Sequence, residues 1–138
     1  MCRAVIYAHG SQQKTVYFPQ KDAKLPVRTR KGGCTLIPWG RRKDEPGILP
    51  MGSHIDLNVL QQGEWDEYLI KPVKLPILSF QQLDIEGNAQ WFIVTAGQWV
   101  QGVLAELREE RRVYIVTIIP NRPDRLYEYW PRLININV

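Results

Sequence analysis

Hydrophobic and polar residues alternate along most of the chain, in short runs that are typical of β-strands. The first two runs cover residues 3–8 and 14–18, and the polar segment from His9 to Gln13 between them predicts a hairpin turn. The same β-branched and aromatic pattern predicts further strands at residues 27–31, 34–40, 73–80, 89–95, 100–107 and 111–119, with a final edge strand at 134–138. The pattern therefore predicts a β-rich fold.

One stretch has helical spacing instead. Residues 64–70 place Trp65, Tyr68 and Leu69 on one side and carry acidic residues in the first turn, which favours a short helix. Residues 54–62 fit either a strand or a short irregular segment.

Turn-forming and charged residues mark the rest of the chain. Glycines and prolines outside any periodic pattern predict a long loop at residues 40–53. Residues 109–112, two glutamates followed by two arginines, predict an exposed turn, and three prolines predict an extended or turning segment at 120–131. Together these elements predict an α+β fold, in which residues 1–138 form a single compact β-rich domain with one or two short helices.

Composition places the chain among ordinary soluble proteins. Its 138 residues are 44% hydrophobic and 23% charged, which fits one domain with a single core. No apolar run approaches the roughly 20 residues that span a bilayer, and the first residues lack the layout of a signal peptide. The two cysteines make no disulfide framework, so we predict a cytoplasmic protein without membrane association.

Charge is distributed unevenly along the chain. Residues 1–43 hold ten Lys or Arg and one acidic residue, whereas residues 44–110 hold three Lys or Arg and eleven acidic residues. The alternation within residues 27–31 predicts that Arg28 and Arg30 share one face of that segment. A basic first third suits a polyanion such as nucleic acid, although a solvated basic surface would give the same composition.

Well-known catalytic and metal-binding motifs are absent from the sequence. It contains no glycine-rich phosphate loop and no HExxH motif, and His9 and His54 have no neighbouring cysteine pattern. We therefore predict no metal and no cofactor, and surface or packing roles for both histidines. Cys34 lies in an apolar run, which favours a place in the core.

The most reactive candidate is Cys2, which directly follows the initiator methionine. Removal of that methionine would leave a free α-amine beside the thiol on the same residue. The amine titrates near pH ~8 and the thiol near ~8.5, so a fraction of each is nucleophilic around neutrality. Such a 1,2-aminothiol condenses with an aldehyde to an imine and closes to a thiazolidine. The alternative is that Cys2 packs as a small hydrophobic residue.

Several segments together resemble the SOS-response-associated peptidase (SRAP) family, and in particular its short bacterial and phage-type members. The resemblance covers almost the whole chain and is carried by the order and spacing of MCR at residues 1–3, LIPWGRRKDEPG at 36–47, KPVKLPILSF at 71–80, WFIVTAGQWVQGVLAE at 91–106, RVYIVTIIP at 112–120 and YEYWPRL at 127–133.

The resemblance implies both a fold and a function. Members of the family are compact β-rich domains with barrel-like sheets. In the response to DNA damage they bind single-stranded DNA and link their N-terminal cysteine covalently to abasic sites. By this analogy Cys2 would be the nucleophile. The strand would be held by four basic residues and one aromatic residue: Arg3, Trp39, Arg41, Arg42 and Lys43.

The sequence departs from the family pattern at the residues that assist the chemistry. Gln82 takes the position of a family glutamate that shuttles a proton, and an amide cannot do so. Tyr127 takes the position of a family histidine, or Glu128 does if the register slips by one residue. Asn58 is the candidate for a family asparagine. Gln82, Tyr127 and Glu128 would line the pocket around Cys2.

Three hypotheses about function remain open at this point. The first is covalent capture of abasic-site aldehydes in single-stranded DNA by Cys2. The second is a nucleic-acid-binding module on the same scaffold that forms no covalent bond, which loss of the glutamate and histidine favours. The third is a peptidase-like or thiol hydrolase activity of Cys2. Because only methionine precedes Cys2, a general methionine aminopeptidase would suffice to expose it.

Overall fold

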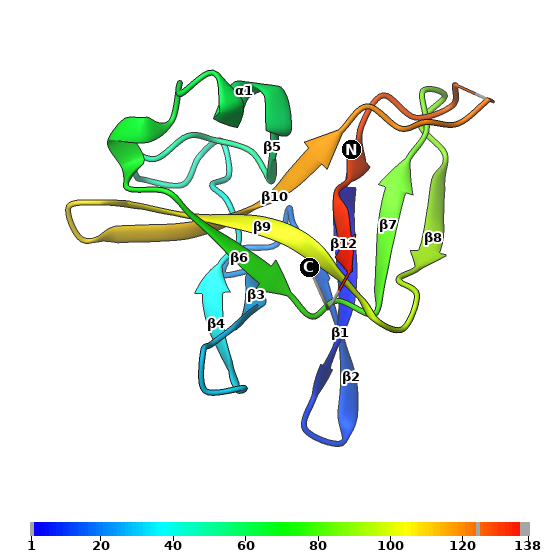
Figure 1. Ribbon diagram of the computed structural model, residues 1–138, viewed down its shortest axis with the longest axis horizontal. Helices are drawn as coiled ribbons and strands as arrows, with labels where there is room; N and C mark the ends of the chain where they lie inside the picture. Colours follow the sequence, from blue (N-terminus) through cyan, green and yellow to red (C-terminus); the bar gives the residue numbers. More distant parts are fainter. Residues whose placement is uncertain (1, 124, 136–138) are drawn as a thin grey trace.

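The computed structural model describes residues 2–123 and 125–135, which form three β-sheets (Figure 1). The first sheet has four strands in the order β2-β1-β7-β8, with bounds β1 (Cys2–His9), β2 (Gln12–Tyr17), β7 (Ser79–Leu83) and β8 (Ala89–Ile93). Gly10 adopts a φ of 65° between β1 and β2, a conformation that costs glycine no steric clash. The hairpin predicted at the start of the chain is therefore confirmed.

The second sheet has six strands and is built around a long hairpin. Strands β9 and β10 are paired centrally, β12 and β6 pair with β9, and β11 and β5 pair with β10. All pairings are antiparallel except the one between β5 and β10. The bounds are β5 (His54–Asp56), β6 (Lys71–Leu75), β9 (Gln98–Leu107), β10 (Glu110–Ile118), β11 (Trp130–Pro131) and β12 (Leu133–Asn135).

The third sheet is the two-stranded hairpin of β3 (Lys24–Arg28) and β4 (Cys34–Pro38). It contacts the six-stranded sheet at two places, because β3 lies beside β6 and β4 lies beside β10. Among the described residues none of the three sheets closes on itself. The expected barrel-like arrangement is therefore replaced by open sheets, within a fold that is β-rich as predicted.

Strand β10 supplies side chains to two hydrophobic clusters. Val113 and Ile115 belong to the larger cluster, which the four-stranded sheet and the β3–β4 hairpin also line. Tyr114 and Val116 belong to the smaller cluster, which lies under the segment from Leu57 to Ile70. Successive side chains of a strand point to opposite faces, so a strand that is covered on both faces is apolar at every position. This burial explains the continuous apolar run in the sequence.

Helical structure is present but not where the sequence predicted it. The α-helix is α1 (Leu57–Gln61), capped by the Asp56 carboxylate, which accepts a hydrogen bond of 2.8 Å from the Asn58 backbone N–H. A helix of five residues is too short to show a 3.6-residue period. Within the segment 64–70, only a single 3₁₀ turn forms, η1 (Asp66–Tyr68).

Two further expectations are corrected by the structure. Cys34 is exposed, because it is the first residue of β4 and lies beside the turn that joins β3 to β4. The exposed turn predicted at 109–112 is shorter, because β10 already begins at Glu110 and Arg112 is buried. Among the described residues, no helix has the length and apolar composition needed to cross a membrane.

Candidate functional site

Cys2 is the first residue of β1, and its backbone lies opposite Gln82 of β7 in the antiparallel ladder. The register shifts between Cys2 and Ala4, so that Arg3 is an extra residue on β1 with an exposed side chain. Such bulges bend a strand locally and are frequent beside functional sites. The pairing brings together two of the residues that the sequence assigned to one pocket.

Gln82 is completely buried, which is unusual for a glutamine. Its Nε2 donates a hydrogen bond of 2.5 Å to the Tyr129 carbonyl, whereas its Oε1 has no partner. A buried acceptor without a partner costs about 1–3 kcal/mol. The unpartnered Gln82 Oε1, on a residue that pairs with the first residue of β1, therefore marks this part of the molecule as a candidate site.

His54 is linked to Gln82 through Tyr129, a connection that the sequence did not reveal. Its imidazole lies against the Tyr129 ring, with 5.1 Å between ring centroids, and Tyr129 in turn accepts the hydrogen bond from Gln82. Burial lowers the pKa of His54 below its ordinary value of 6.5, so the ring is neutral at pH 7 and able to accept a proton. A lone histidine outside any motif gave no signal in the sequence.

Tyr127 and Glu128 have no described contact with Gln82. The Tyr127 ring is buried in an aromatic cluster, 5.6 Å from Phe92 and 5.3 Å from Trp130 between centroids. Glu128 is exposed and lines a shallow depression of about 300 Å³ beside Tyr129. The contact to Gln82 comes from the Tyr129 backbone instead, so the structure does not support Tyr127 or Glu128 as its partner.

Asn58, the candidate for the family asparagine, has an exposed side chain at the first turn of α1. Its backbone N–H is satisfied by the Asp56 cap. This position explains Asn58 as part of a helix start and gives it no described contact with Gln82 or His54.

Trp39 is a core residue, and the expectation that it stacks on a DNA base is corrected. Its side chain is 0% exposed, and its Nε1 donates a hydrogen bond of 3.0 Å to the Ser53 carbonyl. The ring meets Phe18 edge to face at 5.4 Å. A base cannot reach a ring that is enclosed in this way, so Trp39 stabilises the fold instead.

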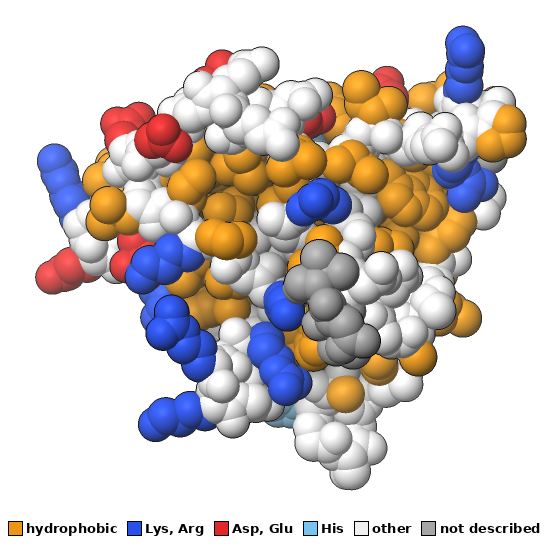
Figure 2. All heavy atoms as spheres, viewed as in Figure 1, with side chains coloured by type: hydrophobic (Ala, Val, Ile, Leu, Met, Phe, Trp, Pro, Cys, Tyr) orange, Lys and Arg blue, Asp and Glu red, His pale blue; other side chains and the backbone are white. Residues whose placement is uncertain are grey.

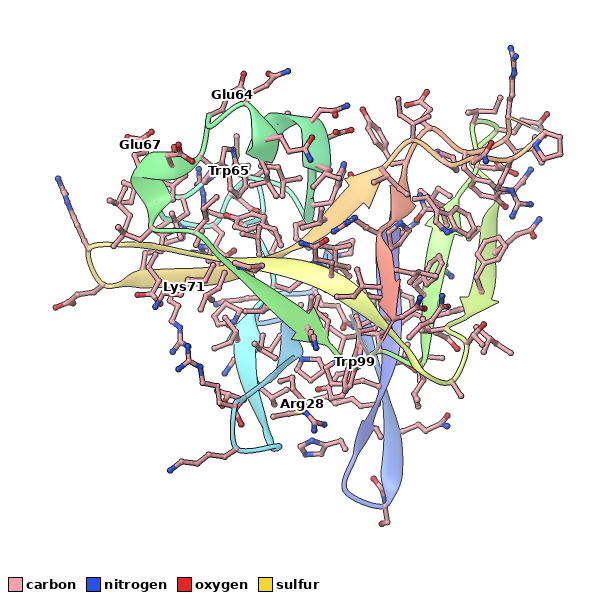
Figure 3. The ribbon with its side chains drawn as sticks, viewed as in Figure 1. Arg28, Glu64, Trp65, Glu67, Lys71 and Trp99 are labelled. Carbon is pink, nitrogen blue, oxygen red and sulfur yellow. The ribbon has the colours of Figure 1, made fainter. Side chains whose placement is uncertain are left out.

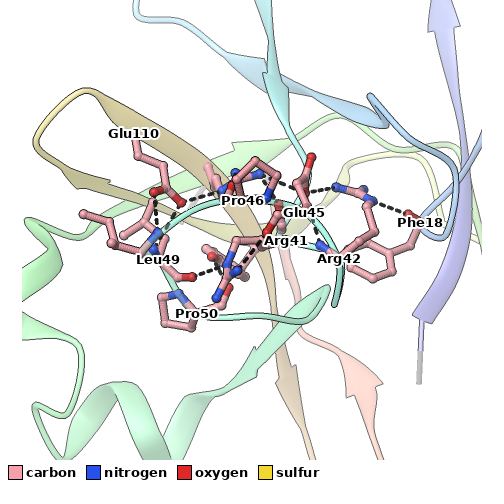
Figure 4. Close-up of polar contacts among 12 residues, drawn as sticks. Phe18, Arg41, Arg42, Glu45, Pro46, Leu49, Pro50 and Glu110 are labelled. Atoms are coloured by element: carbon pink, nitrogen blue, oxygen red, sulfur yellow. Dashed lines mark hydrogen bonds and ion pairs between the residues drawn. The ribbon is translucent and has the colours of Figure 1, made fainter.

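Arg41 and Arg42 hold the loop that follows Trp39 (Figure 4). Arg41 donates from Nε to the Leu49 carbonyl at 2.7 Å and from Nη1 to the Glu45 carbonyl at 2.9 Å. Arg42 is buried, donates from Nε to the Phe18 carbonyl at 2.7 Å and forms an ion pair with Glu45 at 3.2 Å. Both guanidinium groups therefore have internal partners and hold the loop, and their assignment as phosphate contacts stays a prediction.

Arg112 also belongs to this loop network. Its Nη1 donates to the Gly40 carbonyl at 2.9 Å, and its Nε lies 2.7 Å from the Glu110 carboxylate. Glu110 also accepts hydrogen bonds from the backbone N–H groups of Ile48, at 2.7 Å, and Leu49, at 3.1 Å. Burial alone would raise the pKa of Glu110, but these hydrogen bonds and the Arg112 charge outweigh it and lower the pKa.

Of the five predicted DNA contacts, Arg3 and Lys43 remain exposed at the surface. Among the described residues no three His, Cys, Asp or Glu side chains are grouped in a way that could hold a metal ion.

Comparisons of the chain with protein-family models, with curated proteins and with solved structures give no match.

Proposed function

We propose that this protein is an SRAP-like single-stranded-DNA-binding protein that captures abasic-site aldehydes covalently through Cys2. The observation that carries the proposal is the buried Gln82 with its unpartnered Oε1, directly opposite Cys2 in the β1–β7 ladder. An amide oxygen at this place can accept a hydrogen bond from an N–H or O–H group, such as the α-amine or the hydroxyl of the first adduct.

The proposed reaction needs no cofactor, oxidant or reductant. After an aminopeptidase hydrolyses the methionine from Cys2, the α-amine adds to the aldehyde carbon of the ring-opened abasic sugar. Loss of one water from this carbinolamine gives an imine. The Cys2 thiolate then adds to the imine carbon, and the thiol proton ends on the ring nitrogen of the thiazolidine. The neutral imidazole of His54 is the candidate proton acceptor for these steps.

The first test is the intact mass of the purified protein before and after incubation with a single-stranded oligonucleotide that carries one abasic site. We expect a protein that lacks the methionine mass and a product with the added oligonucleotide mass. A matched oligonucleotide without the abasic site should give no product, and Cys34→Ala should react normally, because Cys34 is an exposed thiol without an α-amine. A processed protein that forms no adduct would contradict the proposal.

The second candidate function is non-covalent binding of nucleic acid on the same scaffold. It is favoured by Gln82, which cannot donate and regain a proton as a carboxyl group does, and by the burial of Tyr127 among aromatic rings. This function predicts binding that weakens steeply with salt and leaves the protein mass unchanged.

Gln82 offers a direct test of how the ring closes. We expect Gln82→Glu to accelerate adduct formation about tenfold, below the 10²–10⁴-fold typical of acid–base groups because the carboxyl must share the buried site with the Tyr129 carbonyl. Burial would keep this carboxyl protonated, so its single O–H would have to turn from the Tyr129 carbonyl to supply a proton to the adduct and regain it afterwards.

The measurement is the rate of the mass shift at several pH values. Gln90→Glu is the matched control, since Gln90 lies opposite Gln82 on β8 but is exposed, and it introduces the same carboxyl group at the surface. Equal acceleration in both variants would show a general charge effect, and slower reaction in Gln82→Glu alone would exclude the assigned acid–base role.

A further inference from the structure

A groove of about 820 Å³ lies between the β3–β4 hairpin and the six-stranded sheet. Four cationic side chains line it, and none of the described residues that line it is acidic; the cations are Arg28, Arg30, Lys71 and Lys74. Figure 2 shows blue side chains gathered on this face over β3, β4 and β6. Arg28 and Arg30 both line this groove, although β3 ends at Arg28 and the strand predicted over residues 27–31 does not extend to Arg30.

The cations approach the groove from two separate strands. Arg28 ends β3 and Arg30 follows it, while Lys71 and Lys74 lie on β6, about 10 Å apart along that strand. Charges on both walls of an open channel suit an extended polyanion more than a single small anion. In contrast to Arg41 and Arg42, the Lys71 side chain is exposed to solvent.

Trp99 of β9 adds an aromatic surface to this groove (Figure 3). The Arg28 guanidinium lies over its ring, 5.2 Å from the centroid, and the Trp99 Nε1 is a buried donor without a partner. A guanidinium can pair with a phosphate, and the planes of a guanidinium and of an aromatic ring can both stack on a nucleic-acid base. This combination favours a nucleic-acid strand over an acidic peptide, which has no bases to stack.

We propose that this groove binds the backbone of a single-stranded nucleic acid and leads it to the Cys2 site; the second part of this statement rests on the proposed function. Ile134 lines the groove, and Tyr129, which holds Gln82, lies five residues before it. Five residues span at most about 18 Å, so a single nucleic-acid strand can reach both the groove and the Cys2 site. This route replaces the one through Trp39, Arg41 and Arg42.

The test is fluorescence anisotropy of a labelled single-stranded oligothymidine of about 20 nucleotides without an abasic site, titrated with the full chain at several salt concentrations. We expect the double variant Lys71→Ala/Lys74→Ala to weaken binding roughly tenfold and to lower the slope of log K against log salt by about 1.4, or 0.7 for each lost phosphate contact. Circular dichroism of each variant checks that it is folded.

Two paired variants serve as comparisons. Lys14→Ala/Lys21→Ala removes two exposed lysines outside the groove, and we expect a much smaller loss of affinity. Arg3→Ala/Lys43→Ala removes the two exposed residues of the surface that the sequence predicted. Equal losses in all three variants, a loss confined to Arg3→Ala/Lys43→Ala, or no binding by the unchanged protein would each overturn the groove.

Competition separates the possible polyanions. Poly-glutamate that displaces the oligonucleotide at equal charge concentration would show a general anion surface and would overturn the assignment to nucleic acid. The binding experiment tests the groove separately from the mass measurement, which tests the Cys2 chemistry. Adduct formation with intact binding in Lys71→Ala/Lys74→Ala would refute the groove alone, whereas groove-dependent binding without an adduct would refute the Cys2 chemistry alone.

Discussion

Cys2→Ser is expected to abolish the stable adduct with an abasic oligonucleotide while leaving a reversible one. Serine retains the α-amine after methionine removal, so the imine can still form. Its hydroxyl is a far weaker nucleophile than a thiolate at neutral pH, so the five-membered ring does not close as a stable product. Intact mass after acid quench should therefore show free protein, where the unchanged chain shows the adduct.

Borohydride trapping makes this prediction specific. Reduction converts the imine of Cys2→Ser into a permanent amine link, so the trapped variant should gain the oligonucleotide mass. Trapping without a stable untrapped product separates the role of the thiol from that of the amine. A stable adduct in Cys2→Ser without reductant would mean that the thiol takes no part, and the aminothiol mechanism would have to be abandoned.

Arg112→Met is expected to destabilise the fold by about 3 kcal/mol, the lower end of the range for breaking a buried ion pair by removing one partner. The side chains of Arg112 and Glu110 are 9% and 16% exposed, so the remaining carboxylate cannot regain full hydration. The same change removes the hydrogen bonds that Arg112 donates to the Gly40 carbonyl, the Glu45 carboxylate and the Pro46 carbonyl, which hold the loop. Urea unfolding monitored by tryptophan fluorescence measures the loss.

Arg111→Met is the matched control, because Arg111 and its partner Glu106 are 51% and 37% exposed at their side chains. An exposed pair contributes at most about 1 kcal/mol, so this variant should stay close to the unchanged protein. Similar losses in both variants would mean that the buried network has no special role.

The pH dependence gives an independent check on the same network. The folded pKa values of Glu45 and Glu110 lie below their ordinary value of 4.5, so their stabilisation is present above pH 4.5 and is lost as the pH falls below it. The difference in stability between the unchanged protein and Arg112→Met should therefore be largest near neutral pH and shrink in acid. A difference that is constant from pH 7 to pH 3 would contradict this account.

The sequence predicted the strands well because alternation and β-branched runs are local signals. The long hairpin of β9 and β10 follows directly from such patterns, and Arg28 and Arg30, which the alternation grouped, line one groove even though β3 ends at Arg28. The five residues of α1 gave no such signal, since they are too few to show a helical period. Local patterns therefore located the sheets, and they also indicated one wall of the basic groove.

The roles of individual arginines were not predictable, because they depend on partners far along the chain. Arg41 and Arg42 read as a basic run in the sequence, yet Arg42 bonds to Phe18 and both meet Glu45. The Trp39 ring lies between residues of different sheets, and no local pattern separates a buried tryptophan from an exposed one. The link from Gln82 through Tyr129 to His54 joins segments that only the fold brings together.

The loop after Trp39 also has a consequence for how the chain is made. The hydrogen bonds that fix it join Ile48 to Glu110 and Gly40 to Arg112, over 62 and 72 residues of sequence. A ribosome releases the chain from its amino end, so this loop emerges long before its anchors do. Contacts of such long sequence separation close late and slow folding. Until residue 112 has emerged, the Gly40 carbonyl and the Ile48 backbone N–H lack their final partners, and Glu45 can pair with Arg42 but not with Arg112.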